Sequence, residues 1–202
     1  MDDLSNSLFN GFVPQGWKDK APQTLKQLVN WMEHFLRRHK QYKDWDEVEE
    51  PKVMWLSGLH TPESYLTALV QTACRAKGWP LDKSIMYTVV TRERNVTNIK
   101  KKLEFGCYIQ GLYLEGARWN EDRQCLDYQK PKELIEELPL IQIIPVEANK
   151  LKLRSTISTP VYVTQDRRNA MGKGGVFDAD LKTDRHVSHW ILQGVALVLN
   201  TD

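Results

Sequence analysis

The sequence lacks a strong excess of either charge, because 28 lysines and arginines face 26 aspartates and glutamates for a net charge of +2. A surface so nearly balanced does not favour nucleic acid or an anionic membrane as the main partner. No apolar run is long enough to span a membrane. The first residues, Met1 to Leu4, offer neither the basic nor the apolar region of a signal peptide. We therefore expect no nucleic-acid partner and no membrane partner.

Cysteine is scarce, with only Cys74, Cys107 and Cys125 in 202 residues. An odd number of widely spaced cysteines without a Cys-x-x-Cys pair does not build a disulfide framework. A reducing compartment fits this usage best. We expect each cysteine to act as a small apolar residue of the core.

Motifs for nucleophilic or nucleotide chemistry are also missing. There is no Gly-x-Ser-x-Gly sequence, and no cysteine lies in a protease-like context. The glycines Gly172, Gly174 and Gly175 suggest a phosphate-binding loop, but no Lys-Ser or Lys-Thr follows them, so a flexible turn is expected. These absences predict a polypeptide with no catalytic residues, no cofactor-binding residues and no cofactor.

One segment carries groups that could bind a metal. His186 and His189 lie three residues apart, close in sequence to Asp178, Asp180 and Asp184. The order of these residues is not that of an EF-hand, so we expect a solvated loop with a histidine packed near Trp190. We accordingly predict no metal site, while a hydrolase or metalloenzyme that uses the two histidines stays open as an alternative.

The sequence does contain the material for a folded core, with 41% hydrophobic residues and seven tryptophans. Large aromatic residues often seat one element on another, so we expect a domain that docks onto something. The pattern changes near residue 85 from helical to strand-like. We therefore predict a helical subdomain over residues 1–84, beginning inside the domain rather than at its start, and a strand-rich subdomain over residues 85–202.

Two helices are predicted in the first part. Residues 22–39 carry an apolar stripe that we expect to pack in the core. The helix begins either with Thr24 and Gln27 as a capping box or with Pro22 in the first turn, and the acidic residues from 44 onward end it. Residues 61–77 form a second helix that begins with Thr61 and Pro62 and ends at Gly78. Before them, three apolar residues have no obvious local partner: Leu8, Phe9 and Phe12.

Strands are predicted around residues 85–90, 107–119, 138–146, 160–164 and 190–199, with a buried helix as an alternative for the last. Short strands separated by glycine and proline suggest a small antiparallel barrel or sandwich. The fold class is thus α+β, with an N-terminal helical part followed by a small antiparallel β-barrel. Three basic clusters, at residues 100–102, 150–154 and 167–168, are taken as solvated loop charge, with an acidic partner surface as the alternative.

Several long stretches resemble the C-terminal domain of dynein heavy chains. They are Trp55–Ala68, Val70–Ala73, Lys77–Asp82, Gly111–Trp119, Thr159–Thr164 and His189–Leu197. Their order and spacing agree, and the resemblance runs from about Leu8 to Asp202. The Gly-Leu-Tyr-Leu-Glu-Gly-Ala sequence from Gly111 looks axonemal, and Leu-His-Thr-Pro-Glu-Ser-Tyr from Leu59 is similar to inner-arm chains.

This resemblance implies helices leading into a small β-barrel, placed after the sixth AAA+ module and across one face of the ring of the same heavy chain. It implies no ATP site and a mechanical role that tunes force, processivity or coupling. Other dynein subunits and microtubules would be reached through the whole motor, in the cytoskeleton of a cilium or flagellum. The rival interpretation is a stand-alone β-barrel module that binds a peptide or ligand, which a deep apolar pocket would support.

Overall fold

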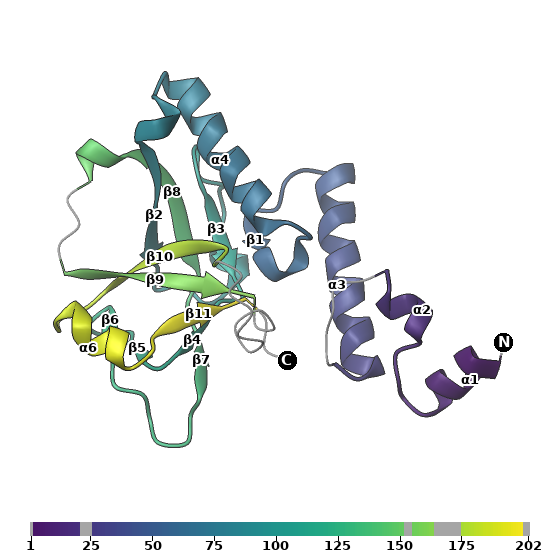
Figure 1. The fold of residues 1–202 in the computed structure, drawn as a ribbon. Coiled ribbons are helices and arrows are strands. Elements are labelled where there is room, and N and C mark those ends of the chain that lie inside the picture. Colours follow the sequence, from purple (N-terminus) through teal and green to yellow (C-terminus); the bar gives the residue numbers. More distant parts are fainter. Residues whose placement is uncertain (1, 21–25, 152–154, 164–174, 200–202) are drawn as a thin grey trace. The chain divides into compact units, whose positions relative to one another are not determined.

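The computed structural model describes residues 2–20, 26–151, 155–163 and 175–199. The described chain divides into two compact units (Figure 1). The helical unit contains residues 2–51 and 58–60, and the sheet unit contains residues 52–57 and 61–199. The predicted division between residues 84 and 85 rests on sequence pattern alone and stays a prediction.

The helical unit consists of α1 (Asp2–Phe9), α2 (Gln15–Lys18) and α3 (Leu28–Glu47). Helix α3 begins later than the predicted residue 22 and continues beyond the predicted end at His39. The acidic residues expected to end it instead form ion pairs one turn apart, Lys40 with Asp44 at 2.6 Å and Lys43 with Glu47 at 3.9 Å. Such pairs support a helix, so the predicted end was wrong.

The start of α3 also differs from the prediction. Thr24, the first residue of the predicted capping box, lies outside the described residues. Gln27 occupies the N-cap position, and its side chain makes no capping hydrogen bond. The backbone N–H of Leu28 instead donates to the carbonyl of Gly11 at 3.1 Å, which ties the start of α3 to the turn after α1.

The second predicted helix is confirmed as α4 (Pro62–Lys77) in the sheet unit. Thr61 precedes it, and Pro62 fills the first helical position, where a missing N–H costs nothing. Gly78 ends the helix in the left-handed conformation, with φ of 66°. The side of α4 that packs against the sheet is buried; it contains Leu66, Val70, Ala73 and Cys74.

The strands of the sheet unit form three sheets. The first has the order β1 (Val53–Trp55), β3 (Cys107–Gln110), β8 (Ile141–Glu147), β2 (Ser84–Val90). The second has the order β10 (Phe177–Lys182), β9 (Thr156–Tyr162), β11 (Ala196–Val198), β4 (Tyr113–Glu115), β7 (Ile135–Glu137). The third is a ribbon of β5 (Arg118–Asn120) and β6 (Cys125–Asp127).

This architecture confirms a mixed α+β fold but not the predicted barrel. Most neighbouring strands are antiparallel, whereas β1 pairs with β3 and β11 with β9 in parallel. Among the described strands, no sheet closes on itself. The parallel pairs explain the difference, because parallel neighbours must come from separate parts of the sequence and cannot be read from successive hairpins.

The two larger sheets meet where β2 adjoins β10. The backbone N–H of Asp180 donates to the hydroxyl oxygen of Thr88 at 2.5 Å, and the N–H of Thr88 donates to the Asp180 carboxylate at 3.4 Å. Burial of that carboxyl raises the pKa of Asp180. The core of the sheet unit contains side chains with no more than 1% exposure: Leu114, Leu126, Ile143, Leu181 and Leu197.

Residues 190–199 do not form the single predicted strand. Residues Val187–Leu192 form the short helix α6, and the strand β11 begins only at Ala196. The ring nitrogen Nδ1 of His186 accepts a hydrogen bond from the N–H of Ser188 at the start of α6. Gly194, with φ of 68°, ends the helical turn. The apolar run is therefore shared between a helix and a strand, and both alternatives were partly right.

Gly116 separates β4 from β5 in a tight space. Its φ is +74°, and a Cβ atom there would lie 2.8 Å from the carbonyl oxygen of Gln193 and 3.2 Å from the nitrogen of Val195. Any larger residue would therefore collide with the backbone that joins α6 to β11. This explains the second glycine of the Gly-Leu-Tyr-Leu-Glu-Gly-Ala sequence.

Four single-turn 3₁₀ helices complete the described residues: η1 (Leu56–Gly58), η2 (Leu81–Lys83), η3 (Val96–Asn98) and η4 (Ala148–Lys150). Across the described ranges, helices with the length and apolar character needed to cross a lipid bilayer are not found.

Candidate functional site

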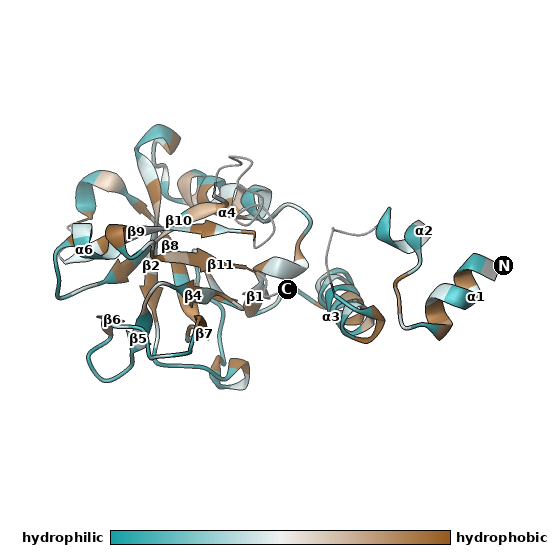
Figure 2. Ribbon diagram, turned by 60° about the horizontal axis from the view of Figure 1, so that its bottom comes forward, coloured by the Kyte–Doolittle hydropathy of each residue, from teal (hydrophilic) through white to brown (hydrophobic). Residues whose placement is uncertain are grey.

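The helical unit exposes a set of apolar side chains on α1, on α3 and in the turn between α1 and α2. Phe9 is 92% exposed, Val29 68% and Leu36 56%. Phe12 and Phe35 are also exposed. Figure 2 shows hydrophobic residues on α1 and along one side of α3. We call these five residues the apolar face of the helical unit.

The apolar face corrects one expectation. The stripe of α3 was predicted to be core, yet Val29, Phe35 and Leu36 are exposed and Trp31 is the buried aromatic residue of this helix. Helix α2 covers little of α3, because it has only four residues. Its Trp17 stacks on Trp31 with ring centroids 5.8 Å apart, and Trp31 stacks on Phe35 at 5.3 Å.

This stack gives the apolar face a fixed arrangement of rings. Nearly parallel rings at such separations attract one another and lose little freedom on further burial. Val13 and Pro14 are buried between the exposed Phe12 and the start of α2. The helical unit thus presents apolar side chains on an ordered base, an arrangement typical of a docking surface.

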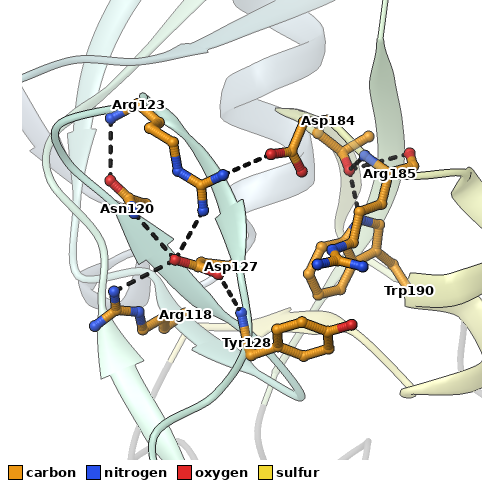
Figure 3. A network of polar contacts seen from close by, with 9 residues as sticks. Arg118, Asn120, Arg123, Asp127, Tyr128, Asp184, Arg185 and Trp190 are labelled. Carbon is orange, nitrogen blue, oxygen red and sulfur yellow. Dashed lines mark hydrogen bonds and ion pairs between the residues drawn. The ribbon is translucent and has the colours of Figure 1, made fainter.

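In the sheet unit, polar side chains gather around Asp127 at the end of β6 (Figure 3). The Asp127 carboxylate accepts hydrogen bonds from Asn120 Nδ2 at 3.0 Å and from the Tyr128 N–H at 2.9 Å. Arg123 and Arg118 also contact it, at 2.9 Å and 3.4 Å. These donors, the Asn120 amide first, hold the pKa of Asp127 far below its usual range.

Arg123 connects this cluster to a distant part of the sequence. Its Nη1 contacts the Asp184 carboxylate at 2.7 Å, just after β10 (Figure 3). The hydrogen bond with Asp127 is the main cause that raises the pKa of Arg123. The ring of Tyr128 lies 4.4 Å from the Arg185 guanidinium, and Trp190 Nε1 donates to Thr183 Oγ1 at 2.5 Å. The network therefore fastens the β5–β6 ribbon to the connection between β10 and α6.

The residues that the sequence offered as possible metal ligands take separate partners. His186 Nδ1 lies 2.7 Å from Ser188 Oγ at the start of α6. His189 packs edge-on against Trp190 at 4.8 Å between ring centroids, as expected, although on a helix rather than in a loop. Asp184 pairs with Arg123, and Asp180 bonds to Thr88. In the described part of the protein, groups of three or more His, Cys, Asp or Glu placed to hold a metal are not found.

The other sequence candidates lie partly outside the described residues. Of the glycine cluster, only Gly175 is described, just before β10; Gly172 and Gly174 are not. The cluster at residues 167–168 and residues 152–154 also lie outside. The three cysteines are buried, as expected for small apolar residues.

A cavity at the junction of the sheets bears on the ligand-binding alternative. It has a volume of about 20 Å³, enough for about one water molecule. Its lining includes Thr88, Asp180 and Trp119. A peptide or drug-sized ligand needs a volume of several hundred Å³. The side chains that fill the core around it therefore weigh against a ligand-binding cavity at this junction.

Comparison with known proteins agrees with the motifs. The family model that describes the C-terminal domain of dynein heavy chains matches residues 1–199. The sequence is 58% identical over 202 residues to the Dynein-1-alpha heavy chain, flagellar inner arm I1 complex, of Chlamydomonas reinhardtii. It is 56% identical over 202 residues to human Dynein axonemal heavy chain 10. The Dynein beta chain of the Chlamydomonas reinhardtii flagellar outer arm is 38% identical over 201 residues.

These matches cover 99–100% of this sequence but only 4% of each relative. The resemblance found in the sequence is thereby confirmed at the level of the family. The family model names the C-terminal domain, and the matched share shows that each relative is a much longer polypeptide. The protein described here belongs to the family of C-terminal domains of dynein heavy chains.

Proposed function

We propose that this protein is a non-catalytic regulatory and structural domain of an axonemal dynein heavy chain, of the inner-arm kind. It packs on the AAA+ ring of the same heavy chain and tunes the force and processivity of microtubule-based movement in a cilium or flagellum. Other subunits of the dynein complex and microtubules are reached through the rest of the motor. The apolar face of the helical unit is the observation that carries this proposal.

The energy available from the apolar face is sufficient for docking. Full burial of a phenylalanine, valine or leucine side chain contributes about 1.5–3 kcal/mol. Phe9, Val29 and Leu36 are each more than half exposed, so several kcal/mol remain to be gained by covering them. The stacked Trp17, Trp31 and Phe35 reduce the entropy lost when the surface is covered.

The rest of the same polypeptide is the best-placed partner. The matched region is 4% of the length of the relatives, so most of such a heavy chain lies elsewhere in the molecule. Covalent attachment makes the docking intramolecular and raises its effective concentration to the millimolar range. A contact of modest strength is then occupied almost all the time.

A test replaces Phe9 and Phe12 by serine in the whole heavy chain. We expect the domain to detach from the ring, because two exposed apolar contacts are lost, and we expect microtubule gliding velocity and ATPase rate to change together. The matched control replaces Leu134 and Leu192 of the sheet unit by serine; these two side chains are 80% and 86% exposed. Crosslinking between the helical unit and the ring measures attachment directly.

The outcome against the proposal is equally definite. Gliding, ATPase rate and crosslinking that stay at the parent level in the Phe9→Ser, Phe12→Ser protein would show that the apolar face does not dock on the ring. A change of the same size in the control protein would remove the assignment to the helical unit.

A further inference from the structure

Two aromatic rings lie against the ammonium group of Lys77, in the last turn of α4. Its Nζ lies 4.6 Å from the ring centroid of Trp79 and 4.6 Å from that of Phe105. Lys150, in η4, places its Nζ 5.6 Å from the Trp79 ring. The segment just before Phe105 carries the basic residues Lys100 to Lys102. The fold therefore brings Lys150, from one basic cluster of the sequence, and Phe105, which closely follows another, to the neighbourhood of Lys77 and Trp79.

The cations of this region differ from those at the β5–β6 ribbon. Arg94, Arg118 and Arg123 all contact carboxylates of the protein itself. Lys77 contacts rings, and within the described residues neither Lys77 nor Lys101 makes an ion pair. Both side chains are on exposed residues. Lys150 pairs with Glu147 in the preceding turn. The positive charge left uncompensated in this region is therefore that of Lys77 and Lys101.

We propose that this lysine cluster, comprising Lys77, Lys101 and Lys150 around Trp79 and Phe105, binds an acidic polypeptide segment of another protein in an extended conformation. The partner is recognised by its carboxylates. This proposal concerns the sheet unit and does not depend on the docking of the apolar face.

The charge of the whole protein favours the carboxylates of a polypeptide over nucleic acid. The three cations of the cluster are lysines, which act as point charges and pair with carboxylates and phosphates alike. The nearly balanced charge of the whole protein provides little of the long-range attraction that nucleic acid requires. Contacts with two rings restrain the ammonium group of Lys77, which lowers the entropy lost on pairing.

The spacing of the cations favours an extended partner. Lys101 precedes Phe105 by four residues, a separation of at most about 14 Å along the backbone. An extended peptide advances about 3.3 Å per residue and points alternate side chains to the same side. A run of glutamates or aspartates can therefore meet the ring-bound Lys77 and the loop lysine Lys101 with different carboxylates.

The test measures, by fluorescence anisotropy, how a labelled poly-glutamate peptide binds to the protein of 202 residues. We expect binding at low ionic strength that weakens at physiological salt, where charges are screened beyond about 8 Å. Lys77→Gln with Lys101→Gln removes two unpaired cations and is expected to weaken binding roughly twofold to thirtyfold. The matched control, Lys130→Gln with Lys132→Gln, removes the same charge from the loop between β6 and β7 of the same unit.

Each outcome either supports or overturns the proposed binding of an acidic polypeptide. Loss of affinity in the cluster variant with the control unchanged supports the proposal, provided that circular dichroism shows both variants folded. Equal loss in the two variants, or no binding by the parent protein, overturns it. An oligothymidylate of matched charge that binds as tightly and responds to the same substitutions overturns the choice of a carboxylate-bearing partner.

Discussion

Replacing Gly116 by alanine tests the reason for a glycine in the motif that carries the family resemblance. An L-residue with φ near +74° costs about 1–2 kcal/mol, of which about 0.4–1 kcal/mol is returned by the lower entropy of the unfolded state. The new Cβ would in addition lie 2.8 Å from the Gln193 carbonyl oxygen. Because the obstacle is backbone, the segment between α6 and β11 must move, which adds about 1–3 kcal/mol. We expect a total loss of about 3 kcal/mol.

Gly78 provides the matched control for this substitution. It has a similar φ of +66°, but a Cβ there would meet no atom within 4 Å. Gly78→Ala should therefore cost only about 1 kcal/mol. Urea unfolding, followed by circular dichroism, measures both losses, and the dependence of free energy on urea should be unchanged.

The comparison between the two variants is what matters. The expected difference of about 2 kcal/mol corresponds to roughly a thirtyfold change in the unfolding equilibrium. Equal losses at the two positions would show that backbone conformation alone determines the cost. The close approach of Gly116 to the α6–β11 connection would then contribute nothing to the loss in free energy of unfolding.

The remaining predictions concern the polar network and the core of the sheet unit. Asp127→Asn should lower stability by about 1 kcal/mol at neutral pH, because a charged acceptor of several hydrogen bonds is lost. The folded-state pKa of Asp127 lies below its unfolded value, so its contribution is present above about pH 4 and disappears as pH falls further. Parent and variant should then converge in acid; a constant difference in thermal unfolding from neutral to acid pH would contradict this. Leu197→Ala, at a fully buried site in β11, should cost about 2–5 kcal/mol, whereas Leu192→Ala at an exposed site should stay within about 0.5 kcal/mol. Similar denaturation midpoints for these two variants would mean that β11 is not part of the core.

The features that the sequence predicted well are those determined by neighbouring residues. Pro62 and Gly78 set the ends of α4 through local backbone preferences, and these ends were found as expected. Thr61 occupies the N-cap position, although its side chain makes no capping hydrogen bond. The alternation from Ile85 to Val90 likewise predicted β2, because one side of a strand packs on the core.

The features that the sequence missed have two different causes. The end of α3 is a local error, because acidic residues were taken as a stop signal while Asp44 and Glu47 pair with lysines one turn earlier. The sheet arrangement depends on contacts between distant residues. The closed barrel was expected from strand count, but the parallel pairing of β1 with β3 and of β11 with β9 follows from the order of strands in space.

The candidate sites show the same division. Exposed Phe9 and Phe12 were anticipated, because no apolar partners surround them in the sequence. The exposure of Val29 and Leu36 was not, since an apolar stripe looks the same whether its cover comes from the same polypeptide or from another molecule. The meeting of Lys77, Trp79 and Phe105 brings together residues separated by a whole strand and loop, so spacing alone gave no sign of it.

Strand β1 has a consequence for how firmly the polypeptide is held where it enters the sheet unit. It has only three residues and a single hydrogen-bonded neighbour, β3, so its ladder alone would let it fray. Its side chains Val53, Met54 and Trp55 are nevertheless all buried, and peeling them away would expose apolar surface worth about 5–8 kcal/mol. The buried side chains, rather than the backbone hydrogen bonds, hold this edge strand in place. A pulling force transmitted from the preceding residues would therefore be resisted at Val53 before β1 separates from β3.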